Sequence, residues 1–191
     1  MIPEEFKETT NNMNWDQYFH NICEAVASKS PCLSRKIGAI LVRDKSIVAT
    51  GYNGPARGIP HCGEERFLKD IRLADELANN IPTIRKTINE MCPRQLMGFV
   101  SGEGLHWCIA EHAERNCIAN AARLGVQTVK TTLYMNSVLP CKNCLTLLIN
   151  AGIKEIVTES VRTYDKNSGF IYLFSEIKTR IFNKEGETNG N

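Results

Sequence analysis

The 191-residue chain has no large excess of charge and no long apolar run. Its formal net charge is only +2, so it offers no broad electrostatic attraction for long nucleic acids or anionic membrane surfaces. No apolar stretch is long enough to span a bilayer, and the start at Met1 lacks the basic and apolar regions of a signal peptide. These absences lead us to expect a cytoplasmic protein without a membrane partner, and they argue against nucleic acid as a partner.

Cysteine, by contrast, is plentiful. Eight cysteines are many for a chain without a recognisable secretion signal. In a reducing compartment such cysteines are metal ligands or buried thiols rather than disulfides. The other composition values, with 42% hydrophobic and 23% charged residues, are ordinary for a globular protein. A chain of this length can bury one well-packed core.

Two short segments combine histidine, glutamate and cysteine at a spacing that suits a metal. They are His112-Ala-Glu114 and Pro140-Cys141-Lys-Asn-Cys144, and each lies at the predicted start of a helix. Cysteines three residues apart share one face of a helix, and the helix dipole favours the thiolate form that zinc requires. The pattern H-x-E followed by P-C-x-x-C is typical of zinc-dependent deaminases of cytosine and adenine.

This residue set predicts a catalytic metal site. His112, Cys141 and Cys144 supply three zinc ligands, which leaves a fourth position for water. Glu114 is not needed as a ligand, and we predict that it is the catalytic acid and base. It would protonate the ring nitrogen and then the departing ammonia, while zinc activates the attacking water. The alternatives are a redox pair or half of a structural zinc site, with Glu114 as an ordinary acid of the first helical turn.

The hydrophobic pattern predicts an α/β fold, because helical periodicity alternates with short apolar runs between turn residues. The predicted helices cover residues 14–30, 67–80, 83–91, 111–124, 141–151 and 170–182, and the predicted strands cover 37–42, 46–52, 131–136 and 153–158. The first two strands form a hairpin. The last two, joined by a helix, are expected to be parallel with a right-handed crossover. This order predicts a three-layer α/β/α sandwich around a mixed sheet.

We expect residues 1–182 to form a single domain. Residues 63–104 interrupt the pattern and are too few to bury a core of their own, so they predict an insertion. Residues 183–191 are polar and predict a disordered tail.

Several segments together resemble a known family. The zinc motifs, the run Ser34-Arg-Lys-Ile-Gly-Ala-Ile-Leu-Val, the loop Gly51-Tyr-Asn-Gly and the run Thr163-Tyr-Asp-Lys-Asn resemble the deoxycytidylate (dCMP) deaminase family of the cytidine deaminase superfamily, including its phage members. The resemblance implies a cytidine-deaminase-like fold with a roughly five-stranded mixed sheet. It implies hydrolysis of dCMP to dUMP and ammonia, which supplies dUMP for thymidylate synthesis. It also implies a homo-oligomer, often a hexamer, with dCTP as activator and dTTP as inhibitor, accompanied by Mg²⁺.

The same resemblance assigns two sets of binding residues. Those for the substrate are Asn53, Ala113 and Tyr164, and those for an allosteric nucleotide are Tyr52, Gly54 and Arg57. An asparagine side chain offers both a donor and an acceptor, although Asn53 could equally be a turn residue and Tyr164 a packing residue. Arg57 and Arg115 could pair with phosphate, or each could be a solvated surface charge.

The resemblance also implies a second, structural zinc. Phage-type members carry one, and the cysteines that match Cys32 and Cys62 are among its ligands. His106 and Cys108 lie just before the predicted zinc helix and complete the expected tetrahedral set, with His61 as a substitute. The alternative is that these residues are buried thiols and surface histidines.

The sequence leaves the substrate open. A deaminase acting on tRNA or single-stranded nucleic acid shares the zinc chemistry, but it would need a basic channel with aromatic platforms. The near-neutral charge and the 7% aromatic content do not favour that alternative. Another cytosine nucleotide as substrate, or a non-catalytic zinc-stabilised binding module, fits the same motif.

Overall fold

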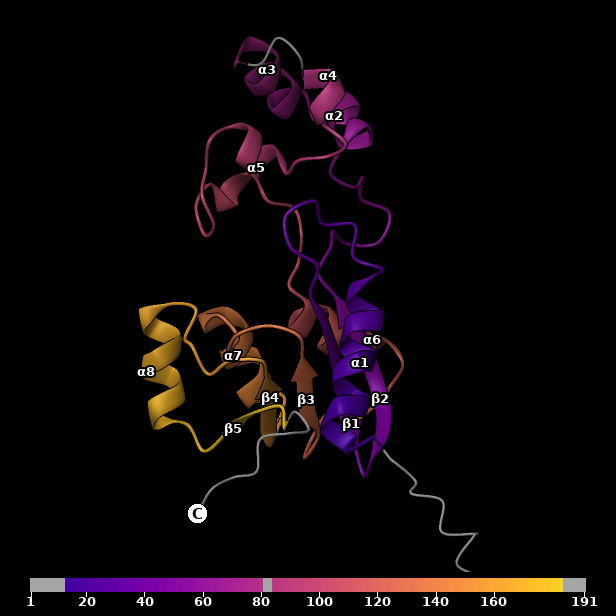
Figure 1. The fold of residues 1–191 in the computed structure, drawn as a ribbon, viewed down its shortest axis with the longest axis vertical. Helices are drawn as coiled ribbons and strands as arrows, with labels where there is room; N and C mark the ends of the chain where they lie inside the picture. Colours follow the sequence, from indigo (N-terminus) through magenta and orange to yellow (C-terminus); the bar gives the residue numbers. More distant parts are fainter. Residues whose placement is uncertain (1–12, 81–83, 184–191) are drawn as a thin grey trace, which may run out of the picture.

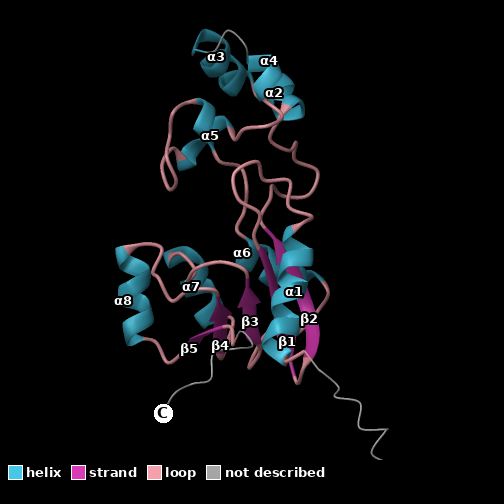
Figure 2. Cartoon of the chain, viewed as in Figure 1, coloured by secondary structure: helices cyan, strands magenta, loops and turns pink. Residues whose placement is uncertain are grey.

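The structure, a computed structural model, describes residues 13–80 and 84–183 (Figures 1 and 2). Its centre is a five-stranded sheet with the order β2-β1-β3-β4-β5. The strands are β1 (Gly38–Arg43), β2 (Ser46–Tyr52), β3 (Thr132–Met135), β4 (Glu155–Thr158) and β5 (Lys178–Ile181). β1 is antiparallel to β2 and β3, whereas β3, β4 and β5 are parallel. The predicted mixed sheet is therefore confirmed.

The hairpin between β1 and β2 is determined by its turn. Asp44 and Lys45 both have positive φ, at 50° and 61°, as a tight two-residue turn between twisted strands requires. Two glycines let helices approach the hairpin closely. A Cβ on Gly38 would lie 2.2 Å from the carbonyl oxygen of Cys23, and a Cβ on Gly51 would lie 2.3 Å from the backbone nitrogen of Cys117. Any other side chain at these two positions would push a helix off the sheet.

Helices cover both faces of the sheet, and the alternation of side chains along β1 separates the two layers. Ile40 faces one layer and packs in a cluster with Phe19 of α1 (Trp15–Ala27). Leu41 faces the other layer, where it packs with residues of α6 (Ala113–Arg123) and α7 (Lys142–Asn150). The three-layer α/β/α sandwich is therefore as predicted.

The insertion forms a lobe that stands apart from the sheet, at the top of Figure 1. It contains α2 (Glu64–Lys69), α3 (Ile71–Asn80), α4 (Ile84–Thr87), α5 (Pro93–Leu96) and the short 3-10 helix η2 (Leu105–Trp107). Leu73, Leu77 and Ile88 are buried there in a small cluster of their own. The expectation that residues 63–104 bury no core of their own is therefore wrong, because the lobe has a small separate core. The division into one domain with an insertion stays a prediction.

The helices of the lobe differ from the prediction. The helix predicted over 67–80 is interrupted at Asp70, whose carboxylate accepts a hydrogen bond from the backbone of Leu73 and so begins a second helix. Of the helix predicted over 83–91, only Ile84–Thr87 is helical, and residues 88–90 form a turn. Thr83 lies outside the described residues. α5 and η2 were not predicted.

The helix predicted over 170–182 is correct only for residues 170–174 and is wrong beyond them. α8 (Lys166–Phe174) begins earlier, because Asp165 and Ser168 form a reciprocal capping box. The chain then turns and adds β5 to the edge of the sheet. Ile177 and Phe182 are buried while Lys178 and Ile181 are exposed, a pattern set by packing on the sheet rather than by helical periodicity. The predicted tail over 183–191 lies outside the described residues except for Asn183.

Within residues 13–80 and 84–183, no helix has the length and apolar character needed to cross a membrane.

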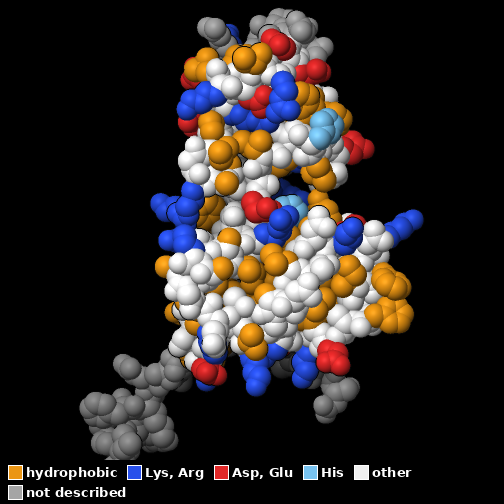
Figure 3. Space-filling view, turned by 180° about the vertical axis from the view of Figure 1, so that it is seen from behind, with side chains coloured by type: hydrophobic (Ala, Val, Ile, Leu, Met, Phe, Trp, Pro, Cys, Tyr) orange, Lys and Arg blue, Asp and Glu red, His pale blue; other side chains and the backbone are white. Residues whose placement is uncertain are grey.

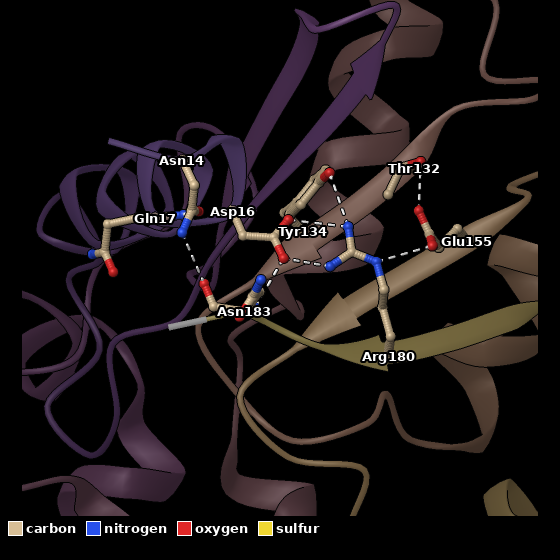
Figure 4. A network of polar contacts seen from close by, with 8 residues as sticks. All are labelled: Asn14, Asp16, Gln17, Thr132, Tyr134, Glu155, Arg180 and Asn183. Atoms are coloured by element: carbon tan, nitrogen blue, oxygen red, sulfur yellow. Dashed lines mark hydrogen bonds and ion pairs between the residues drawn. The ribbon is translucent and has the colours of Figure 1, made fainter. Parts of the chain in front are cut away.

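A polar network fastens β5 to the start of α1 (Figure 4). The guanidinium of Arg180 donates to Asp16 at 3.0 Å and to Glu155 at 3.1 Å. The Asp16 carboxylate also accepts the backbone N–H of Asn183 at 2.9 Å. Asp16 is only 9% exposed, so its charge depends on these donors. The network therefore holds β5, the edge strand that the sequence pattern did not predict, against the rest of the fold.

We predict that Arg180→Ala lowers the free energy of unfolding by about 1–2 kcal/mol, because it leaves the buried Asp16 carboxylate with fewer donors while Arg180 itself is partly solvated. Urea denaturation of the variant and the parent measures this. Lys178→Ala, which removes an exposed charge from the same strand, is the control. Equal losses from the two variants would contradict the role assigned to the network.

Candidate active site

Two helix N-termini meet at the centre of the candidate site. His112 is the N-cap residue of α6, and Cys141 is the N-cap residue of α7. Both have extended backbone conformations, so their side chains leave the helix axis and turn toward the space between the two helices. Cys144, in the first turn of α7, is fully buried beneath them. The chain thereby brings together three ligands from two motifs that are distant in sequence.

These three side chains have the spacing of zinc ligands. The Nδ1 atom of His112 lies 3.5 Å from Cys141 Sγ and 3.3 Å from Cys144 Sγ. Tetrahedral zinc with its usual Zn–N and Zn–S bond lengths would separate such atoms by about 3.5 Å. The set of one imidazole and two thiols is chemically suited to zinc. The residues present therefore fit the metal.

The electrostatics favour a thiolate at this position. Hydrogen bonds from Cys144, and then from His112, lower the pKa of Cys141 to about 4. The same contact with Cys141 raises the pKa of His112 above its usual value. The same hydrogen bond between the two thiols raises the pKa of Cys144, so within this pair the negative charge is favoured on Cys141.

Glu114 lies in the first turn of α6 and is only 4% exposed. Burial raises the pKa of its carboxyl group, and the nearby His112 only partly opposes this effect. A buried carboxyl group with a raised pKa holds its proton more readily than an exposed one, which suits it to proton transfer. The site therefore combines a metal position with a group suited to proton transfer.

A cavity of about 90 Å³ opens onto these residues, between the sheet and the lobe. The expected substrate residues Asn53, Ala113 and Tyr164 all lie in its lining. The Asn53 side chain is nevertheless already bound: its Oδ1 accepts from the backbone of Ile37 and its Nδ2 donates to the carbonyl of Arg35, each at 2.8 Å. Asn53 therefore holds the loop before β1 in place, and its contact with substrate stays a prediction.

The residues expected to bind an allosteric nucleotide lie apart from this cavity. Tyr52 and Arg57 line a separate pocket together with Asn120, to which Arg57 donates a hydrogen bond at 3.0 Å. Gly54 does not line that pocket. Its backbone pairs with Glu111 through two hydrogen bonds, of 3.0 and 2.8 Å, and so ties the Gly51-Tyr-Asn-Gly loop to the residue before His112.

The residues expected to hold the second zinc lie in three different places, and that zinc stays a prediction. Cys32, Cys62 and Cys108 line one cavity of about 30 Å³, but the fourth cysteine in that lining is Cys92, which was not predicted. His106 lies outside the lining, and its ring packs against the rings of Phe99 and Trp107. His61 lines the pocket of Tyr52 and Arg57 instead.

Among the described residues, two groups of potential ligands have their donor atoms within 4.8 Å of one another. One is the His112, Cys141 and Cys144 set. The other is His20, Glu24 and Glu159, where His20 Nε2 lies 2.9 Å from a Glu159 oxygen. Both glutamates of the second group are exposed, so an ordinary surface ion pair explains it.

Two arginines of the cavity lining were not singled out from the sequence. Arg35 belongs to the run before β1, and Arg94 belongs to α5 of the lobe. Arg115, which was considered for phosphate, does not line this cavity and instead pairs with Glu111 at 3.3 Å. Seen from behind, acidic, basic and histidine side chains gather near the middle of the molecule, between the lobe and the sheet (Figure 3).

The fold and the site together define a class. An α/β/α sandwich that presents one histidine and two cysteines from two helix N-termini, with a buried glutamate beside them, is the arrangement of the zinc-dependent deaminase class. The family model "Cytidine and deoxycytidylate deaminase zinc-binding region" matches residues 13–160. The chain belongs to this family, and His112, Cys141 and Cys144 form its zinc-binding site.

Individual relatives agree with this assignment. The chain is 30% identical to the deoxycytidylate deaminase of Saccharomyces cerevisiae over 88% of its length, and 31% identical to that of Mycobacterium phage D29 over 75% of its length. It spans 45% of the yeast protein and 93% of the phage protein. The chain thus spans less than half of the fungal relatives, since it also covers only 44% of the Schizosaccharomyces pombe enzyme.

Among solved structures, the dCMP deaminase of cyanophage S-TIM5 in complex with dCMP and dUMP has the same fold. Its TM-score is 0.58 at 21% sequence identity, and the match covers 89% of this chain and 99% of that chain. The expected cytidine-deaminase-like fold is therefore confirmed.

We predict that His112→Ala lowers the zinc content of the purified protein by one equivalent per chain, because two thiolates alone do not hold the ion at this position. Metal analysis by mass spectrometry of the parent and the variant measures this. His20→Ala is the matched control, since it removes a histidine from the other group of ligands. Loss of zinc from the His20 variant, with the metal retained in the His112 variant, would contradict the placement.

Proposed function

We propose that this protein hydrolyses dCMP to dUMP and ammonia, supplying dUMP for thymidylate synthesis. The observation that carries the proposal is the buried Glu114 carboxyl beside the three zinc ligands. The names of the yeast and phage relatives support the choice of dCMP. A metabolite as substrate and a chain rich in free thiols fit the cytoplasm as the place of action.

The residues of the chain divide the chemistry between them. Zinc, when bound, would lower the pKa of a water molecule and so supply a nucleophile near neutral pH. Glu114 accepts a proton from the water and delivers it to the ring nitrogen of cytosine. The water oxygen adds to C4 of the ring, and Glu114 then moves the remaining proton of that oxygen to the exocyclic amine. The C4–N bond breaks, and the amine leaves as ammonia. Burial keeps Glu114 away from bulk water, so each proton stays within the site.

The cavity lining suits a cytosine ring at its inner end. Ala113 is small and buried beside Glu114, which leaves space for a flat base. Asn53 has a second N–H that can face the base once its first has been donated to Arg35. Tyr164, at 37% exposure, lies at the outer edge of the cavity, where its ring can cover the sugar.

We predict that Glu114→Gln lowers kcat for dCMP by about 10²- to 10⁴-fold, because an amide cannot carry a proton between water, ring and leaving group. The variant keeps its zinc, since Glu114 is not a ligand. Ammonia release from dCMP, CMP, dCTP, deoxycytidine and a cytosine-containing oligonucleotide measures both the activity and the substrate. Glu90→Gln, at an exposed position of the lobe, is the control. Unchanged activity of the Glu114 variant, or action on the oligonucleotide alone, would refute the proposed function.

We extend the proposal to a second, structural zinc held by Cys32, Cys62, Cys92 and Cys108. These thiols come from four separate segments and line one cavity, but their sulfur atoms do not yet lie within 4.8 Å of one another, so binding an ion would draw them closer together. Burial raises the pKa of Cys62, but a bound dication would favour its thiolate. The guanidinium of Arg66, 3.8 Å from Cys62 Sγ, adds positive charge nearby. Such an ion would fasten the lobe to the loop before β1.

We predict two zinc ions per chain in the parent protein and one in Cys62→Ser. Metal analysis together with a Cys23→Ala control, which alters a buried thiol of α1 outside this cavity, measures the stoichiometry. A single zinc in the parent would rule out the second site.

The regulatory part of the proposal concerns the pocket of Tyr52 and Arg57. The pocket lies next to Gly54, whose backbone pairs with Glu111, the residue before His112. A nucleotide bound in the pocket could therefore influence the zinc helix through a short series of contacts. We propose that dCTP and dTTP, each with Mg²⁺, bind there as activator and inhibitor.

We also propose that the chain forms a homo-oligomer, with a hexamer as the favoured state. The exposed apolar side chains of α8, among them Phe170 and Leu173, are suited to burial between copies.

A further inference from the structure

We propose that Arg94, a residue of the inserted lobe, binds the phosphate of the nucleotide substrate and so makes the site selective for nucleotides over nucleosides. The inference rests on the proposed function. Arg94 lies in α5, between two cavities: it lines the cavity of His112 and Glu114, and it also lines the smaller cavity of the four cysteines. The lobe therefore contributes a cation to a site whose chemical groups all come from the sheet domain.

The guanidinium of Arg94 has hydrogen-bonding capacity left over. The side chain is half-buried, and its Nη1 donates to the backbone carbonyl of Glu103. Its Nε atom is shielded from solvent but has no hydrogen-bond partner among the residues that the structure describes. A buried donor without an acceptor is unfavourable, so a ligand oxygen that meets it would remove that cost. The bond to Glu103 engages Nη1, and it leaves Nε without an acceptor.

The charges in the lining favour an anion at this end. Arg35 supplies a second guanidinium to the lining, and Ser34 and Ser137 add hydroxyl groups. The lining contains two carboxylates, Glu111 and Glu114. Glu111 is paired with Arg115 and accepts the backbone N–H of His112, which leaves little free negative charge facing Arg94.

Glu114 lies at the buried end and has its own role in proton transfer. Arginine presents several donors in a plane and binds phosphate oxygens in pairs, more strongly than a neutral donor does. The chemistry of this end of the cavity therefore matches a phosphate monoester rather than an uncharged sugar.

The lobe holds Arg94 in place through buried contacts. Cys92 and Pro93, which precede it, are buried, and Pro93 occupies the first position of α5. The buried Arg66 of α2 donates to the carbonyl of Trp107 at 2.8 Å and so joins the two ends of the insertion. These contacts fix the backbone on which Arg94 is carried, and a binding residue requires such a rigid support.

The test compares a nucleotide with its nucleoside. In Arg94→Gln, KM for dCMP is expected to rise about 10- to 100-fold, because a charge-assisted contact to phosphate is lost. The KM for deoxycytidine and the kcat for both substrates stay within about threefold, since the base and the proton-transfer groups are untouched. Arg94→Lys recovers part of the loss because it keeps the charge. Arg72→Gln, which removes an arginine 81% exposed in the same lobe, is the matched control and changes neither KM.

Calorimetric binding of dUMP and deoxyuridine provides a readout that does not depend on turnover. The selectivity of the parent for dUMP over deoxyuridine is expected to fall about 10-fold or more in Arg94→Gln. Equal losses for nucleotide and nucleoside, or no loss for either, would overturn the inference. If the parent releases ammonia from neither dCMP nor deoxycytidine, the proposed function fails, and the binding comparison still decides the role of Arg94. Zinc content and thermal unfolding show whether each variant is folded. If Arg94→Gln is not folded, the comparison is made with Arg94→Lys instead.

Discussion

One geometric constraint organises this protein: the N-termini of α6 and α7 must meet. His112 begins one helix and Cys141 begins the other, and their ligand atoms lie 3.5 Å apart. The two helices pack on the same face of the sheet, over β1 and β3. Gly51 lets α6 settle against β2 without a clash. If the sheet order or this close packing were lost, the three ligands would separate and the metal would have no site.

The second consequence of this packing is a buried carboxyl group. Glu114 is enclosed because α6 lies flat on the sheet, and enclosure raises its pKa. The same enclosure that would be a cost to stability in an ordinary core makes the group useful as a proton carrier. The lobe closes the other side of the cavity and brings Arg94 to it. The fold thus brings residues of α6, α7 and the lobe to one cavity, where the three zinc ligands, the buried Glu114 carboxyl and the Arg94 guanidinium meet.

The sequence predicted the sheet core and the zinc ligands well, because local signals determine them. Turn residues at Asp44 and Lys45 and the H-x-E and P-C-x-x-C motifs each depend on a few adjacent residues. It failed where long-range contacts decide. The strand Lys178–Ile181 exists because β4 offers it an edge and Arg180 reaches Asp16 across the fold. Cys92 and Arg94 lie in a lobe without a recognisable pattern, so only the structure shows which cavities they line.

The central claim is that three protein ligands hold the catalytic zinc and leave one position for a small molecule. A crystal structure with anomalous diffraction measured at the zinc absorption edge tests it most directly. The account predicts an anomalous peak bonded to His112 Nδ1 and to the sulfurs of Cys141 and Cys144, with water or a ligand as the fourth partner and Glu114 close by but not bonded. A fourth bond from Glu114 or another side chain, or no peak between these residues, would contradict it.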